Sequence, residues 1–278
     1  ENQGRGGEPL GIFADDDLCD VDGAAASNLL FMPFWTWQMS YMKSELSGLR
    51  PLETTGGGFD VGLNHSPPSS QGGGGPARVV NHAYASDEYR KIRMTYYDAG
   101  DKVQVFNSLW YPDPKYDLPV LGIDLLAFGR KKYLTVVDFQ PIHGTEDEHA
   151  APYERLLGPI REKYPTLQGS MTDRFYDSNR HFSSETLFGR FEDEGVVAEE
   201  VWPAFRRSVE AHVGLVRGTE PDGSSAAMVR TLRGQRAYDR YSAKRDPAHA
   251  LFSRIFGKEW ADGYVYDFLF DLSGGPEE

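Results

Sequence analysis

The sequence predicts a mixed fold of strands and helices, in which helices cover both faces of one antiparallel β-sheet. Four β-rich segments follow one another in the centre of the chain, joined by the short turns "DAGDK", "PDPKYD" and "GRKK". Such short connections are typical of antiparallel hairpins. Helical patterns precede and follow this block, and that order favours a sheet with helices packed on each side.

The individual elements follow from residue spacing. Strands are predicted over residues 89–98, 101–112, 118–129 and 131–141, and a further strand over "ETLFGRFE" at 185–192. The segment 26–47 has large apolar residues at helical spacing and predicts an amphipathic helix; these residues are Phe31, Trp35, Met39, Met42 and Leu46. Further helices are predicted over 151–164, 196–216, 224–244 and 247–270.

Composition also suggests how the chain is divided. Residues 1–23 are rich in glycine and then in acids, which predicts a flexible tail. Residues 24–278 are predicted to form one domain. Within it, residues 54–77, "TTGGGFDVGLNHSPPSSQGGGGPA", have the composition of a mobile loop insertion.

Several classes of function are disfavoured by composition. The only cysteine, Cys19, excludes an intrachain disulfide and a thiolate iron–sulfur or zinc site. The glycine-rich stretches lack the GxGxxG spacing of a dinucleotide fold. We therefore expect no permanently bound cofactor, so that electrons for any redox reaction come from outside. The net charge of −13 disfavours nucleic acid and anionic membranes as partners.

An acid stands in the middle of an apolar strand, "LPVLGIDLLAF" at residues 118–128. Alternate residues of a strand share a face, and aspartate is rarely buried without a partner. Asn107 of the preceding strand faces the same cavity as Asp124 if the two strands pair. Gly122, on the same side, leaves room for a flat group. The alternative is that Asp124 forms a core ion pair with an arginine from a covering helix.

A second acid, Asp239, lies within a basic run, "RGQRAYDRYSAKRDP". At helical spacing the cations form one stripe; they are Arg233, Arg236, Arg240, Lys244 and Arg245. One interpretation is an edge that binds ligand carboxylates or docks an acidic protein. The other is an ordinary solvated helix face.

Three segments resemble the ferredoxin-dependent bilin reductases: "VFNSLWYPDPKYDLPVLGIDLLAF", "FSSETLFGRFEDE" and "YDRYSAKRDPAHALFSRIFGKEWADGYVYDFLFD". The similarity covers about residues 85–272. It implies an α/β/α sandwich, with an open-chain tetrapyrrole (bilin) bound between the sheet and the C-terminal helices. It also implies reduced ferredoxin as the external electron donor.

The resemblance further implies roles for single residues. Asp124 matches the family's central-strand aspartate, which takes part in proton transfer, and Asp239 matches a second aspartate on the helix side. Arg240 falls near a propionate of the bilin. Asn107 stands where the phycocyanobilin-forming branch has histidine, and Thr95 stands where that branch has glutamate. We expect Asn107 to be catalytic, with Gly122 and Arg161 as further substrate-binding residues.

These departures argue against the phycocyanobilin-forming branch and fit the other branches of the family. Among those, "LFGRFEDE" and the insertion at 54–77 favour the reduction of 15,16-dihydrobiliverdin to phycoerythrobilin. The alternatives within the family are the enzyme that forms 15,16-dihydrobiliverdin from biliverdin, and phytochromobilin synthase. A non-catalytic bilin carrier is the alternative from a different class. We expect a monomer in an algal plastid or a cyanobacterial cytoplasm. Its partners would be ferredoxin and, in addition, a preceding bilin reductase or an acceptor phycobiliprotein or lyase.

Overall fold

The computed structural model describes residues 29–52, 61–64, 77–143, 147–171 and 180–275. The segment 1–23 lies outside the described residues, and so does most of the segment 54–77. The strands, helices and contacts of the structure are those of the described residues.

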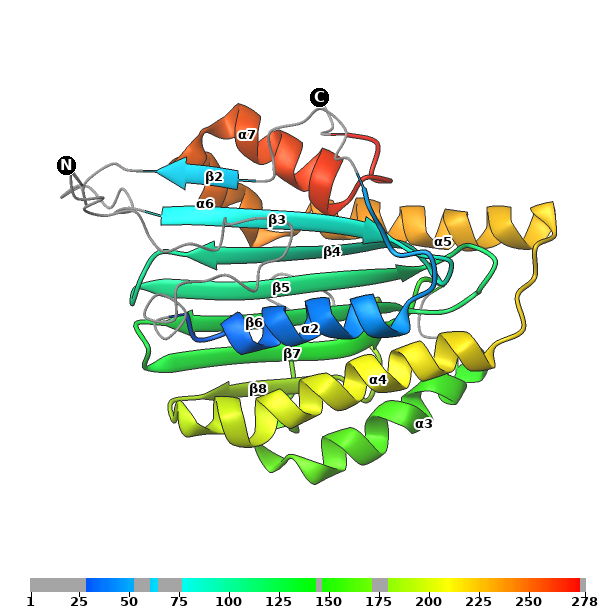
Figure 1. Cartoon of the computed structure of the whole chain (residues 1–278), viewed down its shortest axis with the longest axis horizontal. Coiled ribbons are helices and arrows are strands. Elements are labelled where there is room, and N and C mark those ends of the chain that lie inside the picture. Colours follow the sequence, from blue (N-terminus) through cyan, green and yellow to red (C-terminus); the bar gives the residue numbers. More distant parts are fainter. Residues whose placement is uncertain (1–28, 53–60, 65–76, 144–146, 172–179, 276–278) are drawn as a thin grey trace.

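Eight strands form one sheet with antiparallel pairing throughout (Figure 1). They are β1 (Arg50–Pro51), β2 (Val61–Asn64), β3 (Ala77–Ala85), β4 (Tyr89–Asp98), β5 (Val103–Pro112), β6 (Val120–Phe128), β7 (Lys132–Gln140) and β8 (Leu187–Phe191). Their order is β1-β3-β4-β5-β6-β7-β8, and β2 also pairs with β3. The five strands expected from the sequence are all present, as β4 to β8.

Strand β2 corrects the expectation that residues 54–77 are loop throughout. Its four residues pair with the first half of β3. Ladder hydrogen bonds join backbone groups, so a short edge strand can form in a segment whose composition is typical of loops. Strand β3 itself was not expected from the sequence.

The helices are α2 (Met32–Glu45), α3 (Asp147–Lys163), α4 (Trp202–Gly218), α5 (Ser225–Ala243), α6 (Pro247–Phe256) and α7 (Lys258–Gly263). Short π-helical turns extend α4 at its start (Val197–Val201) and α7 at its end (η3, Tyr264–Leu269). The single helix expected over 247–270 is broken at Gly257, whose φ of 97° lies in the region that favours glycine. This break separates α6 from α7.

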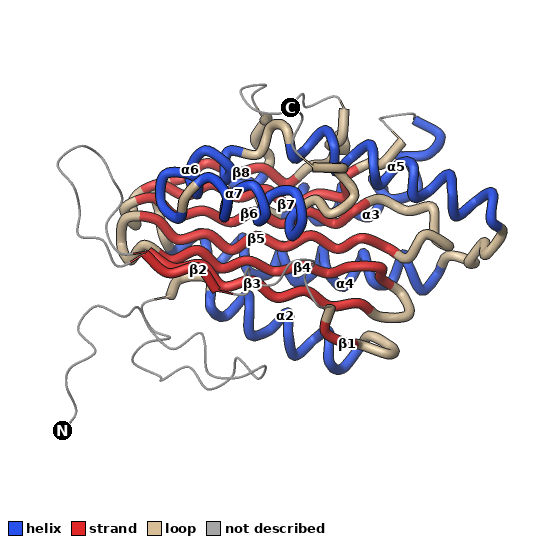
Figure 2. Tube along the Cα trace, turned by 90° about the horizontal axis from the view of Figure 1, so that it is seen from above, coloured by secondary structure: helices blue, strands red, loops and turns tan. Residues whose placement is uncertain are grey.

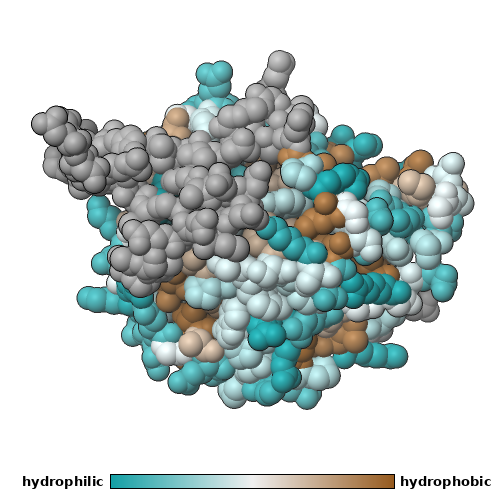
Figure 3. Space-filling model, viewed as in Figure 1, coloured by the Kyte–Doolittle hydropathy of each residue, from teal (hydrophilic) through white to brown (hydrophobic). Residues whose placement is uncertain are grey.

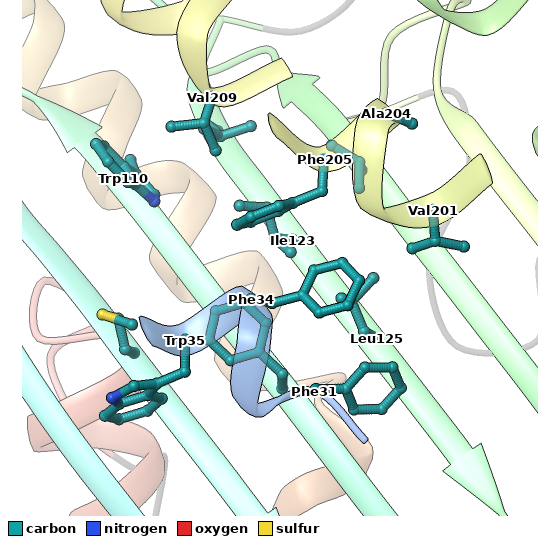
Figure 4. Packing of buried hydrophobic residues seen from close by; sticks show 14 of the residues in the cluster. Phe31, Phe34, Trp35, Trp110, Ile123, Leu125, Val201, Ala204, Phe205 and Val209 are labelled. Carbon is teal, nitrogen blue, oxygen red and sulfur yellow. The ribbon is translucent and has the colours of Figure 1, made fainter. Parts of the chain in front are cut away.

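The helices form layers on both faces of the sheet (Figures 1 and 2). Helices α2, α3 and α4 share one apolar core with the sheet, and α5, α6, α7 and η3 share the other. In the first core, Phe34 and Trp35 of α2 and Phe205 of α4 pack over Ile123 and Leu125 of β6 (Figure 4). The expected α/β/α sandwich is confirmed.

The outer surface of this layer is mostly hydrophilic. The space-filling view of the side that carries α2 and α4 shows polar residues with apolar ones between them (Figure 3). This is the distribution expected when amphipathic helices turn their apolar faces toward a sheet. The candidate site lies on the opposite side of the sheet.

Candidate active site

Asn107 and Asp124 are direct neighbours across β5 and β6. The Asn107 Nδ2 donates a hydrogen bond of 3.0 Å to Asp124 Oδ1. Both side chains are partly exposed, on the face of the sheet that packs against α5, α6 and η3. The expected pairing of the two strands, which places these side chains side by side on one face, agrees with this geometry.

The surroundings of this pair are apolar and incompletely covered. Five apolar strand residues on the same face remain partly exposed. Val136 is the direct partner of Asp124, and the others lie toward the C-terminal end of β6; they are Val103, Val105, Leu126 and Leu134. Toward the other end of β6, Leu109 and Val120 on this face are buried. We refer to the five partly exposed residues as the apolar patch. An apolar surface beside one hydrogen-bonded acid is suited to a flat ligand that carries few polar groups.

The Asp124 carboxyl is held near its titration point at neutral pH. Burial raises its pKa to about 7, and the negative charge of Asp246 acts in the same direction. The hydrogen bond from Asn107 and the charge of Arg93 lower the pKa. Accessible surface still reaches the side chain, and a ligand over the apolar patch would complete its burial. Such a carboxyl can hold a proton and release it near pH 7.

Asp246 is a site residue that we did not single out from the sequence. It is the N-cap of α6, and its Oδ1 accepts from the backbone N–H of Ala248 at 2.8 Å. Its charge raises the pKa of both Asp124 and Tyr264, so it acts on the site electrostatically from the helix side. The signal was present in "RDPAH", because an aspartate followed by proline is typical of a helix start.

Asp239 does not join the pair. It is fully buried, Tyr111 Oη donates to its Oδ1 at 2.8 Å, and the Leu272 N–H donates to its Oδ2 at 3.0 Å. Tyr111 lies four residues, ~13 Å, along β5 from Asn107. Burial raises the pKa of Asp239 to about 6. With both oxygens engaged, this carboxylate anchors the C-terminal segment to α5 and β5.

The space expected beside Gly122 is filled. A Cβ at this position would lie 2.5 Å from Gln140 Oε1, which accepts a hydrogen bond of 2.5 Å from Tyr238 Oη. A bilin could lie there only if the Gln140 amide moved, because the amide occupies the room. Gly122 therefore permits close packing of Gln140 in this structure.

The two predicted substrate-binding arginines lie in different places. Arg240 is exposed on α5, and its Nε donates to the Ser273 carbonyl at 3.2 Å. Arg161 belongs to α3 on the opposite face of the sheet, where it donates to the carbonyls of Thr186 and Gln168. The structure does not bring Arg161 to the other residues, so we leave it out of the site.

The basic stripe is exposed along and just beyond α5, as both sequence interpretations require. Next to it lies a cavity of about 340 Å³. Its lining comprises Ile142, His143, Arg180, His181, Arg230, Arg233, Gly234 and Ala237. Neither Asn107 nor Asp124 lines this cavity, so the basic cavity and the apolar patch are different sites.

Within the described ranges, no cluster of three or more His, Cys, Asp or Glu residues could hold a metal ion. The helices of that part of the chain include none that is long and apolar enough to span a membrane.

Comparison with known families identifies the class of protein that carries this site. The family model for ferredoxin-dependent bilin reductases matches residues 63–271. The chain belongs to this family. As a bilin reductase it is an oxidoreductase that uses ferredoxin as electron donor and an open-chain tetrapyrrole as substrate.

Curated relatives of this reductase include two cyanobacterial proteins named 15,16-dihydrobiliverdin:ferredoxin oxidoreductase. The protein from Gloeobacter violaceus is 43% identical over 69% of this chain and 78% of its own length. That from Nostoc punctiforme is 40% identical over 77% of this chain and 88% of its own length.

A solved structure of tomato phytochromobilin synthase in complex with biliverdin has a TM-score of 0.75 and 18% identity. It covers 89% of this reductase and 85% of the tomato chain. At this identity the likeness concerns the fold alone.

Proposed function

We propose that this reductase converts biliverdin to 15,16-dihydrobiliverdin with electrons from ferredoxin. From the sequence we placed the later step, from 15,16-dihydrobiliverdin to phycoerythrobilin, first and the dihydrobiliverdin-forming step second. The names of the relatives support the step that forms 15,16-dihydrobiliverdin from biliverdin. We therefore adopt it as the proposal and keep the step to phycoerythrobilin as the competing outcome of the test.

The bilin is proposed to bind over the apolar patch, between the sheet and the layer formed by α5, α6 and η3. There Asp124 would contact it from the sheet and Asp246 would face it from the helix side. The single observation that carries the proposal is the Asn107–Asp124 pair, with a carboxyl whose pKa is about 7 on an incompletely covered apolar surface. This is the chemistry needed to supply protons to a bound, electron-rich ring system.

The proposed reaction adds two electrons and two protons to one double bond. Ferredoxin supplies the electrons one at a time, so the bilin itself carries the unpaired electron between the two transfers. The protein contributes the protons and decides which carbon receives them. With a pKa of about 7, Asp124 is protonated in about half of the molecules at pH 7 and can give up its proton without a large energetic cost.

A non-catalytic bilin carrier would need the apolar patch but no titrating acid. Burying a carboxyl without a chemical purpose is unfavourable, because apolar surroundings disfavour its charged form. Asp124, together with the nearby charge of Asp246, therefore supports catalysis over storage.

Ferredoxin is the external electron donor of the proposed reaction. We propose that the protein binds no cofactor permanently and that it acts as a monomer. A colourless purified protein that elutes at about 31 kDa tests both points.

The deciding experiment is an anaerobic assay with reduced ferredoxin and either biliverdin or 15,16-dihydrobiliverdin, followed by absorbance and product chromatography. Wild type should consume biliverdin and leave 15,16-dihydrobiliverdin unchanged. Asp124→Asn, which retains shape and hydrogen-bonding capacity, should bind biliverdin but turn over about 10²- to 10⁴-fold more slowly. Consumption of 15,16-dihydrobiliverdin alone would establish the phycoerythrobilin step instead, and spectral binding without turnover would indicate a carrier.

A further inference from the structure

Arg93 is a buried cation next to the proposed proton donor. Its side chain lies on β4, 1% exposed, and no carboxylate in the described ranges forms an ion pair with it. Arginine stays charged in proteins, and a buried charge is costly unless it is paired. Arg78, equally buried on β3, forms the usual ion pair, with Asp98 at 3.0 Å. The unusual environment of Arg93 therefore needs an explanation.

The contacts of Arg93 lead to the reactive pair. Its Nη1 donates a hydrogen bond of 2.5 Å to Asn107 Oδ1, and its guanidinium lies 5.6 Å from the centroid of the Phe270 ring. Its Nε has no hydrogen-bond partner among the described residues. Arg93 lies diagonally across β4 and β5 from Asn107, since its direct partner in register is Leu109. The contact thus joins neighbouring strands on the site face of the sheet.

This contact determines the orientation of the Asn107 amide. A guanidinium has only donors, so the amide oxygen of Asn107 must face Arg93 and its NH₂ group must face Asp124. Asp124 Oδ1 consequently accepts a hydrogen bond. This favours Oδ1 as the carbonyl oxygen of the protonated acid, because a carbonyl oxygen accepts better than a hydroxyl oxygen. The acid proton is then favoured on Oδ2, which makes no hydrogen bond within the described part of the chain and is available to a ligand.

We propose that Arg93 is a positioning residue for the reaction: through Asn107 it keeps the transferable proton on Oδ2 of Asp124, and its charge makes that proton easier to release. The inference rests on the proposed function of Asp124 as proton donor. It assigns to the β4 arginine a role in setting the acidity of the site, in addition to any role in packing.

The charged and titratable groups that face Asp124 come from three elements. Arg93 on β4 lowers the pKa of Asp124, and Asp246 at the start of α6 raises it. The phenol of Tyr264 in η3 is the third group, and it feels the charge of Asp124. Removing Arg93 takes away a positive charge and frees Asn107 to turn away, and both changes raise the pKa of Asp124. Removing the charge of Asp246 lowers that pKa.

The test is the infrared C=O absorption of protonated Asp124, measured against pH in the bilin-free protein and assigned by its loss in Asp124→Asn. In Arg93→Met the midpoint should rise by about one unit, whereas Arg93→Lys, which keeps the charge, should stay within about 0.3 unit of wild type. Asp246→Asn should shift the midpoint downward. A purely structural role for Arg93 would lower stability in both Arg93 variants and leave the midpoint in place.

A midpoint in Arg93→Met that equals that of wild type overturns the inference. If Arg93→Met fails to fold, Asn107→Ala interrupts the same chain of contacts at its centre. Its midpoint should then rise as well, and an unchanged value is equally decisive. Failure of the proposed function is distinguishable, because Asp124→Asn would then reduce biliverdin at the wild-type rate whatever the infrared midpoints show.

Discussion

The variant Asp239→Asn tests whether Asp239 anchors the C-terminal segment or acts as a catalytic acid. The wild-type carboxyl is fully buried and has a pKa of about 6, against an ordinary value of 3.8. Burial is the largest cause, Asp271 adds to it, and Arg90 and Lys91 oppose it. Because the pKa is higher in the folded than in the unfolded protein, ionisation of Asp239 lowers the free energy of unfolding. The cost is absent below pH ~4, grows between pH ~4 and ~6, and is complete above that range.

The size of the effect follows from the two pKa values. The full shift of about 2 units corresponds to about 3 kcal/mol at 1.36 kcal/mol per unit. At pH 4.5 about 1 kcal/mol of this cost is already present, and at pH 7.5 nearly all of it. Asparagine does not ionise, so the stability of Asp239→Asn relative to wild type should improve by about 2 kcal/mol between pH 4.5 and pH 7.5. The asparagine can still accept from the Leu272 N–H and donate to Tyr111 Oη.

The assay is urea unfolding of both proteins at the two pH values, together with turnover of biliverdin at pH 7.5. We expect the free energies of unfolding to converge or cross as pH rises, with turnover within about threefold of wild type. A difference in unfolding free energy that is the same at both pH values would refute the buried, ionisable anchor. A loss of turnover of about 10²-fold or more would restore Asp239 as the catalytic acid expected from the sequence.

Three further changes test other parts of the structure. Asp246→Ala should lower the free energy of unfolding by about 1 kcal/mol through loss of the α6 cap, and Asp246→Asn should restore it, as thermal or urea unfolding would show. Gly122→Ala should displace the Gln140 amide and cost about 1 kcal/mol in the same measurement; no loss would mean that the amide moves freely. If acidic ferredoxin docks on the basic stripe, charge reversal at Arg233 and Lys244 should raise the apparent KM for ferredoxin, as added salt should, without changing biliverdin affinity. Weaker biliverdin binding with unchanged ferredoxin dependence would place the docking site elsewhere.

The sequence was most informative where local pattern determines geometry. A short turn between two apolar strands required antiparallel pairing, and this pairing brought Asn107 opposite Asp124. The same reasoning selected Asp239 and passed over Asp246, which lies seven residues further along in the same basic run. Only the end of α5 at Ala243, and the contacts beyond it, distinguish the anchor from the acid that faces Asp124.

Other features depend on contacts that no sequence pattern displays. The Gln140 amide reaches the space beside Gly122 because Tyr238 of α5 holds it there. Strand β2 is stabilised by backbone pairing with β3 rather than by a hydrophobic pattern. Nothing in the sequence marks Arg93, because its contact with the site is a hydrogen bond to Asn107 of the neighbouring strand.

The C-terminal segment packs late in the chain on the face of the sheet that carries Asp124, and this order affects folding. Strands β4 to β7 are consecutive hairpins, whose contacts are local and form early. Asp271, by contrast, forms an ion pair with Lys91 of β4 at 2.8 Å, across 180 residues of sequence, and Leu272 bonds to Asp239. During synthesis the sheet can therefore assemble while the face that carries Asp124 is still uncovered. Residues 264–272 pack on that face only after they have emerged, so we expect the newly made protein to pass through a stage with a more exposed apolar surface.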